Sequence, residues 1–396
     1  MIYHGTFLFP ESGERLSGRL GTEHGRIGWF EAGDARDGDV SLPGTVTPGL
    51  IDAHVHLTLD GGIDPVGTLL RQSLTERVLS AAQRLQRNLY AGITTVRDLG
   101  GPNNIAVDLA KAVEAGTLTG SRVVACGHNL TMTGGHGHAF GREADGVDGV
   151  RRAARDELKA GAAVLKFMAT GGVLTPGVRA GAEAYTLEEM RAGAEEAHKA
   201  GKRTAAHAQG LQGIKNALRA GIDTIEHGAF DEWDEEGLEL LLTRHLVPTL
   251  AAPNGILGGR GQLAAWILDK TEPIAERHQE TTAEAYRAGA LIVAGTDAGT
   301  PLNPHGSLSR ELSLLRSVGL TPLGVLQAAT VTAADALDLT GLAGTLTSGA
   351  HADLVAWDGN PLEDITAYER PQVVVKGGVR LEPADPSYTP TAAPLA

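Results

Sequence analysis

Short apolar runs alternate with amphipathic segments through the middle of this sequence, and that alternation restricts the fold more than any other feature. The runs have the length of buried β-strands. The segments between them carry apolar residues three and four positions apart, as amphipathic helices do. The predicted strands are 50–57, 93–99, 122–130, 164–169, 203–208, 224–228, 246–251 and 291–297. Eight strand-then-helix units predict an α/β fold of the TIM-barrel type, (β/α)8. An open doubly wound sheet is the alternative, but no glycine-rich nucleotide-binding motif follows the first strand.

Two of the predicted helices can be described in more detail. After the first strand, apolar residues recur at helical spacing and predict one helix whose single apolar face packs on the sheet. The positions of this stripe are Leu70, Leu74, Val78, Ala82, Leu85 and Leu89. Further along, Thr186 and Glu189 have the spacing of a capping box, which predicts that a helix begins just after Thr186.

The two ends of the chain differ from this pattern. Residues 1–47 and 346–396 contain short alternating runs separated by Gly, Asp and Pro, which are typical of antiparallel strands. Neither end carries enough apolar surface for its own core, so we expect both ends to pair in one small β-sandwich domain. The barrel domain is then expected to occupy residues 48–345. From Glu382 onward the sequence is rich in Pro and Ala, and we expect this tail to be loose.

The composition excludes several classes of function. The formal net charge is −14, which disfavours binding to nucleic acid or to an anionic membrane surface. The single cysteine, Cys126, excludes an intrachain disulfide and any zinc motif built from cysteine pairs. The N-terminal residues lack the pattern of a signal peptide, and no apolar run is long enough to span a membrane. We therefore expect a cytoplasmic protein that acts on a small molecule. A homo-oligomeric state is expected as well.

Two histidines stand at the end of the first predicted barrel strand. His54 and His56 are two positions apart, so their side chains point to the same side of the strand. Two imidazoles in this arrangement can chelate one metal ion. The alternative is a pair of histidines that only bond to a neighbouring turn.

A lysine interrupts the fourth predicted strand, which is otherwise apolar. A buried, unpaired ammonium is costly, so Lys166 is expected to lose its proton. The neutral amine is a nucleophile that can form a Schiff base or take up carbon dioxide as a carbamate, and a carbamate can bridge two metal ions. The alternative is a lysine whose tip reaches solvent at the end of the strand.

Three further polar residues close later strands. His207 and His227 end the fifth and sixth strands, and Asp297 ends the last one, where a carboxylate needs a partner cation. The alternatives are core histidines bonded to backbone and an aspartate that caps a helix. Active sites of barrels lie where the strands end. Together with the other strand-end residues, this set predicts a centre for zinc or a similar divalent ion, with two ions favoured over one.

With these residues in place, the chain resembles the amidohydrolase superfamily over most of its length. The segment GLIDAHVHL is similar to the first-strand motif of the superfamily, and LAGTLTSGAHADLVAWDGNPLEDI is similar to its return into the small β-sandwich. The long run that ends in AGAAVLKFMATGGV is similar to a narrower branch. That branch contains prolidase-type zinc dipeptidases, hydrolases of ochratoxin-like amides and proteins called imidazolonepropionase-like.

The resemblance implies a set of metal ligands and a reaction. The implied ligands are His54, His56 and Asp297 for the first ion, His207 and His227 for the second, and a carboxylated Lys166 for both. It also implies that a metal-bridging hydroxide attacks an amide carbonyl while Asp297 transfers the proton. True imidazolonepropionases resemble a one-metal form without the lysine, so Lys166 argues against that specific label.

Candidate substrate-binding residues lie in the loops after the strands. His136, in the glycine-rich TGGHGH segment, could donate to a tetrahedral oxyanion, and His138 lies beside it. Arg179 could pair with the carboxylate of a dipeptide, and His305 follows the last strand. Gln209 stands where dipeptidase relatives often carry a tyrosine. For the histidines and the arginine, the alternative is a loop position without contact to substrate.

These observations predict a binuclear metal-dependent amidohydrolase that cleaves a peptide or amide bond. The specific expectation is a dipeptidase (Xaa-Pro or a basic C-terminal residue) or an N-acyl amino acid hydrolase. One alternative is a hydrolase of a cyclic amide, a lactone or an organophosphate, because the same hydroxide serves them all. Another is a catalytically silent barrel that acts as a binding scaffold, but such a protein is expected to have lost ligands that this sequence retains.

Overall fold

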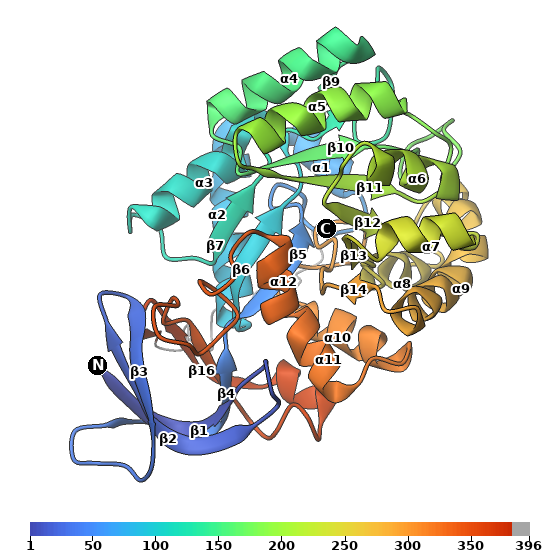
Figure 1. The fold of residues 1–396 in the computed structure, drawn as a ribbon. Coiled ribbons are helices and arrows are strands. Elements are labelled where there is room, and N and C mark those ends of the chain that lie inside the picture. The colour runs from blue at the N-terminus through green and yellow to red at the C-terminus, as the bar shows by residue number, and fades with distance from the viewer. Residues whose placement is uncertain (382–396) are drawn as a thin grey trace.

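The computed structural model describes residues 1–381, and its centre is a barrel of parallel strands enclosed by helices (Figure 1). The barrel strands are β5 (Leu50–Val55), β6 (Ile93–Asp98), β7 (Arg122–Ala125), β8 (Leu130–Thr131), β10 (Val164–Met168), β11 (Arg203–Ala208), β12 (Thr224–His227), β13 (His245–Val247) and β14 (Leu291–Ile292), with the short β9 (Arg142–Glu143) beside β8. They form a seven-stranded sheet in the order β14-β13-β12-β11-β10-β8-β9 and a three-stranded sheet, β5-β6-β7. All their pairings are parallel, which confirms the predicted TIM-barrel fold.

The two sheets join through backbone hydrogen bonds on both sides. On one side, the amide of Ala163 donates to the carbonyl oxygen of Ala125 over 2.8 Å. On the other side, the amide of Asp297 donates to the carbonyl oxygen of His54 over 2.7 Å. We call this second junction the seam, because the first and last barrel strands meet there. Two of the predicted metal ligands therefore lie on opposite sides of the seam.

Three predicted strands end earlier or break in the structure. The predicted strand 122–130 is divided into β7 and β8, because Gly127 turns the chain with a φ of 72°. β13 ends at Val247, short of the predicted residue 251, and β14 ends at Ile292, short of residue 297. Asp297 itself has a φ of 57°, so the extended conformation cannot continue through it. After β13 and β14, the chain therefore leaves the sheet before it reaches Thr249 and Asp297, whose side chains line the barrel mouth.

The predicted helix over residues 70–89 is in fact two helices. They are α1 (Pro65–Arg71) and α2 (Leu74–Tyr90), and Ser73 caps α2 in a capping box with Glu76. The stripe residues that pack against the barrel are Ala82, Leu85 and Leu89, whereas Leu70, Leu74 and Val78 are exposed. The single apolar face predicted from the sequence is therefore wrong in its first half: Leu70 belongs to a separate helix, and Leu74 and Val78 are exposed in the first turns of α2.

The other helices surround the barrel (Figure 1). They are α3 (Ile105–Glu114), α4 (Gly146–Ala160), α5 (Leu187–Lys199), α6 (Leu211–Arg219), α7 (Glu235–Leu241), α8 (Ala251–Gly258), α9 (Ala265–Arg287), α10 (Leu308–Ser317), α11 (Pro322–Ala328) and α12 (Val331–Ala336). The capping box predicted at Thr186 is confirmed, and α5 begins directly after it. Within residues 1–381, no helix is long and apolar enough to cross a membrane.

Both ends of the chain meet in one small β domain, as predicted. Its strands are β1 (Ile2–Leu8), β2 (Arg15–Glu23), β3 (Arg26–Ala32), β4 (Val40–Pro48), β15 (Leu354–Trp357), β16 (Pro371–Lys376) and β17 (Val379–Leu381). They pair in the order β17-β16-β15-β4-β1-β2-β3, so the contact between β4 and β15 joins the two ends. Tyr3, Phe7 and Leu354 belong to a core cluster of this domain. The boundaries predicted for the two domains stay a prediction, and the tail expected to be loose lies outside the described residues.

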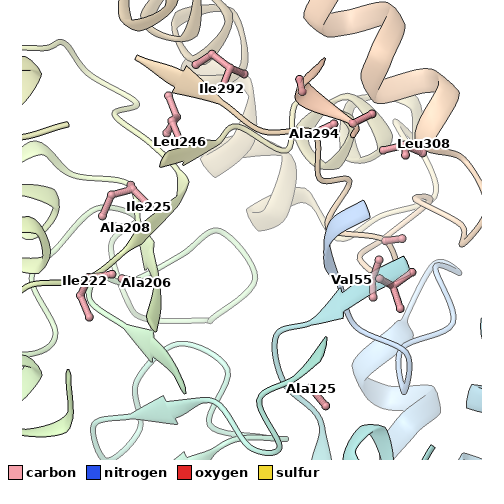
Figure 2. Packing of buried hydrophobic residues seen from close by; sticks show 14 of the residues in the cluster. Val55, Ala125, Ala206, Ala208, Ile222, Ile225, Leu246, Ile292, Ala294 and Leu308 are labelled. Carbon is pink, nitrogen blue, oxygen red and sulfur yellow. The ribbon is translucent and has the colours of Figure 1, made fainter. Parts of the chain in front are cut away.

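Side chains of the barrel strands alternate between two apolar clusters. The larger cluster includes Ala206, Ile225 and Ile292, which Figure 2 shows on their strands. The smaller one includes Val164 and Ala205, which are the neighbours of large-cluster residues along their strands. Because successive side chains of a strand point to opposite sides, the smaller cluster fills the inside of the barrel and the larger one faces the helices.

Candidate active site

The same alternation directs polar side chains to the mouth of the barrel. Lys166 and His207 lie two positions after Val164 and Ala205 on β10 and β11, so they point inward as well. All predicted metal ligands line one cavity of about 170 Å³. These residues are His54, His56, Lys166, His207, His227 and Asp297. The structure thus brings together side chains from both ends of the barrel sequence.

His54, His56 and Asp297 form the tightest group of donors. Nε2 of His56 lies 3.3 Å from Oδ1 of Asp297, and Nε2 of His54 lies 3.5 Å from the same oxygen. One ligand atom from each of the three lies within 4.8 Å of the others, and all three residues are buried. This group could hold one divalent ion.

A buried carboxylate binds His54 on Nδ1, the ring nitrogen that does not face Asp297. Nδ1 of His54 lies 2.8 Å from Oε2 of Glu226, and the other oxygen of Glu226 accepts a 2.8 Å hydrogen bond from Arg97. All three side chains are at most 1% exposed. Histidine ligands of metals commonly carry such a carboxylate on the second nitrogen, because it fixes the tautomer and the orientation of the ring.

His56 and His227 are also held through Nδ1, but by uncharged partners. Nδ1 of His56 lies 2.8 Å from the carbonyl oxygen of Gly100, and Nδ1 of His227 lies 2.7 Å from the hydroxyl of Thr249. In each ring Nε2 is therefore the nitrogen left for the cavity. The left-handed φ of His227, 73°, marks the point where β12 ends.

His207 and His227 come from neighbouring strands and face each other. β11 and β12 pair with Ala208 opposite His227, and the two rings have centroids 4.6 Å apart. Burial is the main cause that lowers the pKa of both histidines well below the usual range. Both imidazoles are therefore neutral at pH 7, the form in which histidine binds metals.

Lys166 is the most unusual group of the site. It is 1% exposed, and its Nζ has no hydrogen-bond partner among the described residues. Burial lowers the pKa of its amine to about 8. An unpartnered buried amine is costly. The described side chains and backbone offer Nζ of Lys166 no hydrogen bond that would compensate for this cost.

Three of the predicted substrate-binding residues line the cavity. They are His136, His138 and Gln209. Nδ1 of His136 lies 2.8 Å from the hydroxyl of Thr175, and burial lowers the pKa of His136 to about 3. Nδ1 of His138 lies 2.9 Å from the carbonyl oxygen of Gly135. The side-chain oxygen of Gln209 is buried without a partner in the described part of the chain.

The other two predicted residues are not among those that line the cavity. Arg179 is exposed to solvent. His305 is buried, and its Nε2 lies 3.1 Å from the carbonyl oxygen of Leu59. The structure thus places His305 in a packing role and leaves Arg179 outside the cavity wall.

Several residues of the site escaped the sequence analysis. Glu226 and Arg97 are charged residues inside fully buried strands, and a charge inside a predicted barrel strand is a signal that could have found them. His278 lies on α9, lines the cavity, and its Nε2 lies 2.8 Å from the carbonyl oxygen of His227. Thr175 and Thr249 carry no such signal, because a threonine in a loop is common.

A (β/α)8 barrel with imidazole and carboxylate donors at its mouth is the arrangement found in many metal-dependent hydrolases. The sequence model of the amidohydrolase family matches residues 45–381, and the chain belongs to that family. An ochratoxinase of Aspergillus niger is 32% identical over 372 residues, which span 84% of this chain and 74% of the ochratoxinase.

Two solved structures are similar over nearly the whole chain. One is a Xaa-Pro dipeptidase with bound methionine in its active site, with 29% identity, a TM-score of 0.88, and coverage of 96% of this chain and 99% of the dipeptidase. The other is a prolidase complexed with N-methylphosphonate-L-proline, with 31% identity, a TM-score of 0.87, and coverage of 96% and 99%. The chain is accordingly an enzyme that hydrolyses amide bonds and resembles the prolidase-like branch of its family.

Proposed function

We propose that this enzyme is a binuclear metal-dependent amidohydrolase that cleaves the amide bond of a dipeptide or an N-acyl amino acid. The observation that carries the proposal is the Lys166 amine, which is buried and unpartnered among four imidazoles and a carboxylate. The names of the relatives, a Xaa-Pro dipeptidase, a prolidase and an ochratoxinase, support amide substrates of this kind.

The donors fit two divalent ions, and zinc is the ion that a set of imidazoles, one carboxylate and one carbamate suits best. The residues that would hold them are His54, His56 and Asp297 for one ion, His207 and His227 for the other, and Lys166 for both. The nitrogen of neutral Lys166 would add to the carbon of carbon dioxide and release one proton. The product is a carbamate, whose oxygens could bind both ions. This would account for a buried amine without a hydrogen-bond partner.

The remaining chemistry can be assigned to the residues of the chain. When bound, the two ions would polarise the amide carbonyl and acidify the attacking water. Asp297 would accept the proton of that water and pass it to the leaving nitrogen. The hydroxyl of Thr175 can donate to Nδ1 of His136, which leaves the proton on Nε2. Neutral His136 would then donate from Nε2 to the oxyanion.

Metal analysis and a substrate library test this proposal together. We expect about two equivalents of zinc per chain in the wild type and turnover within a library of dipeptides and N-acyl amino acids, with prolyl and basic C-terminal residues assayed first. Lys166→Ala should retain at most one equivalent. A wild type with one equivalent, whose activity survives Lys166→Ala, would disprove the binuclear site. An absence of turnover on any amide of the library would disprove the substrate class.

A further inference from the structure

A lysine on α9, next to the cavity-lining Thr271, has no negative partner. Lys270 lies on α9, and its Nζ donates to the carbonyl oxygens of Thr175 over 2.6 Å and Val178 over 2.5 Å. The same nitrogen lies 5.4 Å from the ring centroid of Trp266. Within residues 1–381, no carboxylate lies within ion-pair distance of Lys270, although the whole chain carries a net charge of −14.

Lys270 retains capacity for a further acceptor. An ammonium has three N–H groups, and two of them are used by the loop carbonyls. The residue is half-buried, and its partial burial lowers the pKa of the amine. A cation in this situation gains more from an anionic ligand than a fully solvated lysine does, because part of its hydration is already lost.

The position of Lys270 connects it to the cavity. Thr271 and Ile274, on the same helix, line the cavity, and so does Thr175, whose carbonyl oxygen Lys270 binds. The pKa of His136 is lowered mainly by burial, and the positive charge of Lys270 is one of the further causes. Lys270 itself is not among the lining residues, but it is bonded to a residue of the wall and lies one turn before the lining Ile274 on the same face of α9.

The charges of the cavity wall decide what else could bind an anionic substrate. The charged residues that line the cavity are Lys166 and Asp297, and both are proposed metal ligands. Much of the rest of the wall is apolar and includes Leu59, Phe140, Met168, Leu174, Phe230 and Ile274. A basic substrate side chain would find no free carboxylate on this wall, whereas an apolar side chain would be well accommodated.

We propose that Lys270 binds the free carboxylate of the substrate's amino-acid arm, and that the substrates are N-acyl amino acids or dipeptides with an apolar C-terminal residue. This inference rests on the proposed amidohydrolase function. It gives to Lys270 the role that the sequence had suggested for the exposed Arg179, and it excludes the preference for a basic C-terminal residue.

Matched substrate pairs test this role. One series consists of the N-acetyl derivatives of phenylalanine, leucine, methionine and proline. The second consists of the corresponding N-acetyl amino alcohols, in which CH2OH replaces the carboxylate. The value of kcat/KM is measured for both series with the zinc-loaded wild type, with Lys270→Gln and Lys270→Arg, and with the exposed control Lys202→Gln.

We expect the wild type to prefer acids over alcohols by about 10- to 100-fold, the size of one charge-assisted hydrogen bond. Lys270→Gln should bring this ratio close to one, mainly through KM, while Lys270→Arg keeps most of it and Lys202→Gln leaves it unchanged. Equal kcat/KM for both series in the wild type would overturn the inference even if the variants fail to fold. An equal loss on acids and alcohols in Lys270→Gln would also overturn it, because the lysine would then only anchor the loop of Thr175. No turnover in either series would instead refute the proposed function itself.

Discussion

Glu226 joins His54 to Arg97 through both of its oxygens, each over 2.8 Å. The three side chains are buried, so the carboxylate neutralises a guanidinium and orients a proposed metal ligand at the same time. In this arrangement, the stability of the barrel and the geometry of the site depend on one residue.

Glu226→Gln is therefore expected to damage both properties. An amide can accept from only one side, so either Arg97 or His54 loses its partner. We expect the free energy of unfolding to fall by about 3–5 kcal/mol, as when one partner of a buried ion pair is removed, and metal affinity to fall by about 10- to 100-fold. Urea unfolding and zinc titration measure the two effects. Glu236→Gln, at a half-exposed position on α7, is the matched control. Unchanged stability in Glu226→Gln would contradict the prediction.

Lys166→Met should stabilise the metal-free protein and lower its metal content. The wild-type amine is buried without a partner in the described residues, and methionine fills a similar volume without that penalty. We expect a gain of about 1–3 kcal/mol in the unfolding free energy of the chelator-treated protein. In the zinc-loaded protein, we expect at most one equivalent of metal. A metal-free variant that is less stable than wild type would show that the amine has a structural partner.

Thr175 is predicted to position His136, because its hydroxyl lies 2.8 Å from Nδ1 of that ring. Thr175→Val removes the hydroxyl and keeps the shape, so both tautomers of His136 become accessible. We expect kcat to fall by about tenfold with little change in KM, and Thr175→Ser to restore most of it. Steady-state kinetics on one substrate suffices. If Thr175→Ser is as impaired as Thr175→Val, the methyl group matters and the hydroxyl does not.

Glu196 predicts an acid-sensitive contact between α4 and α5. Its carboxylate accepts hydrogen bonds from Arg155 over 2.9 Å and Arg151 over 2.7 Å, and these lower its pKa from 4.5 to about 2. Because the folded pKa lies below the unfolded one, this stabilisation is present above pH 4.5 and is lost as the pH falls towards 2. We expect Glu196→Gln to cost up to about 1 kcal/mol at pH 7, because the arginine partners are partly exposed and solvent screens the pair. Urea unfolding at pH 7 and pH 3 should show a smaller difference from wild type at pH 3. A difference that does not depend on pH would exclude the titration of Glu196 as its cause.

The barrel and its cluster of donors could be predicted because both depend on local patterns. Apolar strands of regular length predict the parallel sheet, and a polar residue at the end of such a strand points to the mouth wherever the alternation places it. His207 and Lys166 follow this rule directly. Asp297 follows it less directly, because its left-handed backbone already lies outside the regular ladder.

The rest depends on contacts between distant segments. The apolar spacing from Leu70 to Leu89 predicts a single helix, but Ser73 begins a second one, and the first positions of the stripe are exposed in both helices. Arg179 is a plausible partner for a carboxylate from its place in the sequence, yet it lies in solvent, while Lys270 on α9 bonds to the carbonyl oxygen of the cavity-lining Thr175. Neither outcome can be read from spacing, because each is decided by how separate segments pack.

The hydrogen bonds of the seam indicate where this enzyme should begin to unfold when it is inactivated. The carboxylate of Asp52 on β5 accepts from the amide of Thr296 over 2.9 Å and from its hydroxyl over 2.7 Å. Asp52 lies two positions before His54, and Thr296 lies one position before Asp297. The same short stretch of backbone hydrogen bonds therefore closes the barrel and positions two of the proposed metal ligands. We expect the seam to open before the rest of the barrel when the protein is heated or treated with chelator. Deuterium uptake at the amides of residues 296 and 297 should then rise before activity is lost.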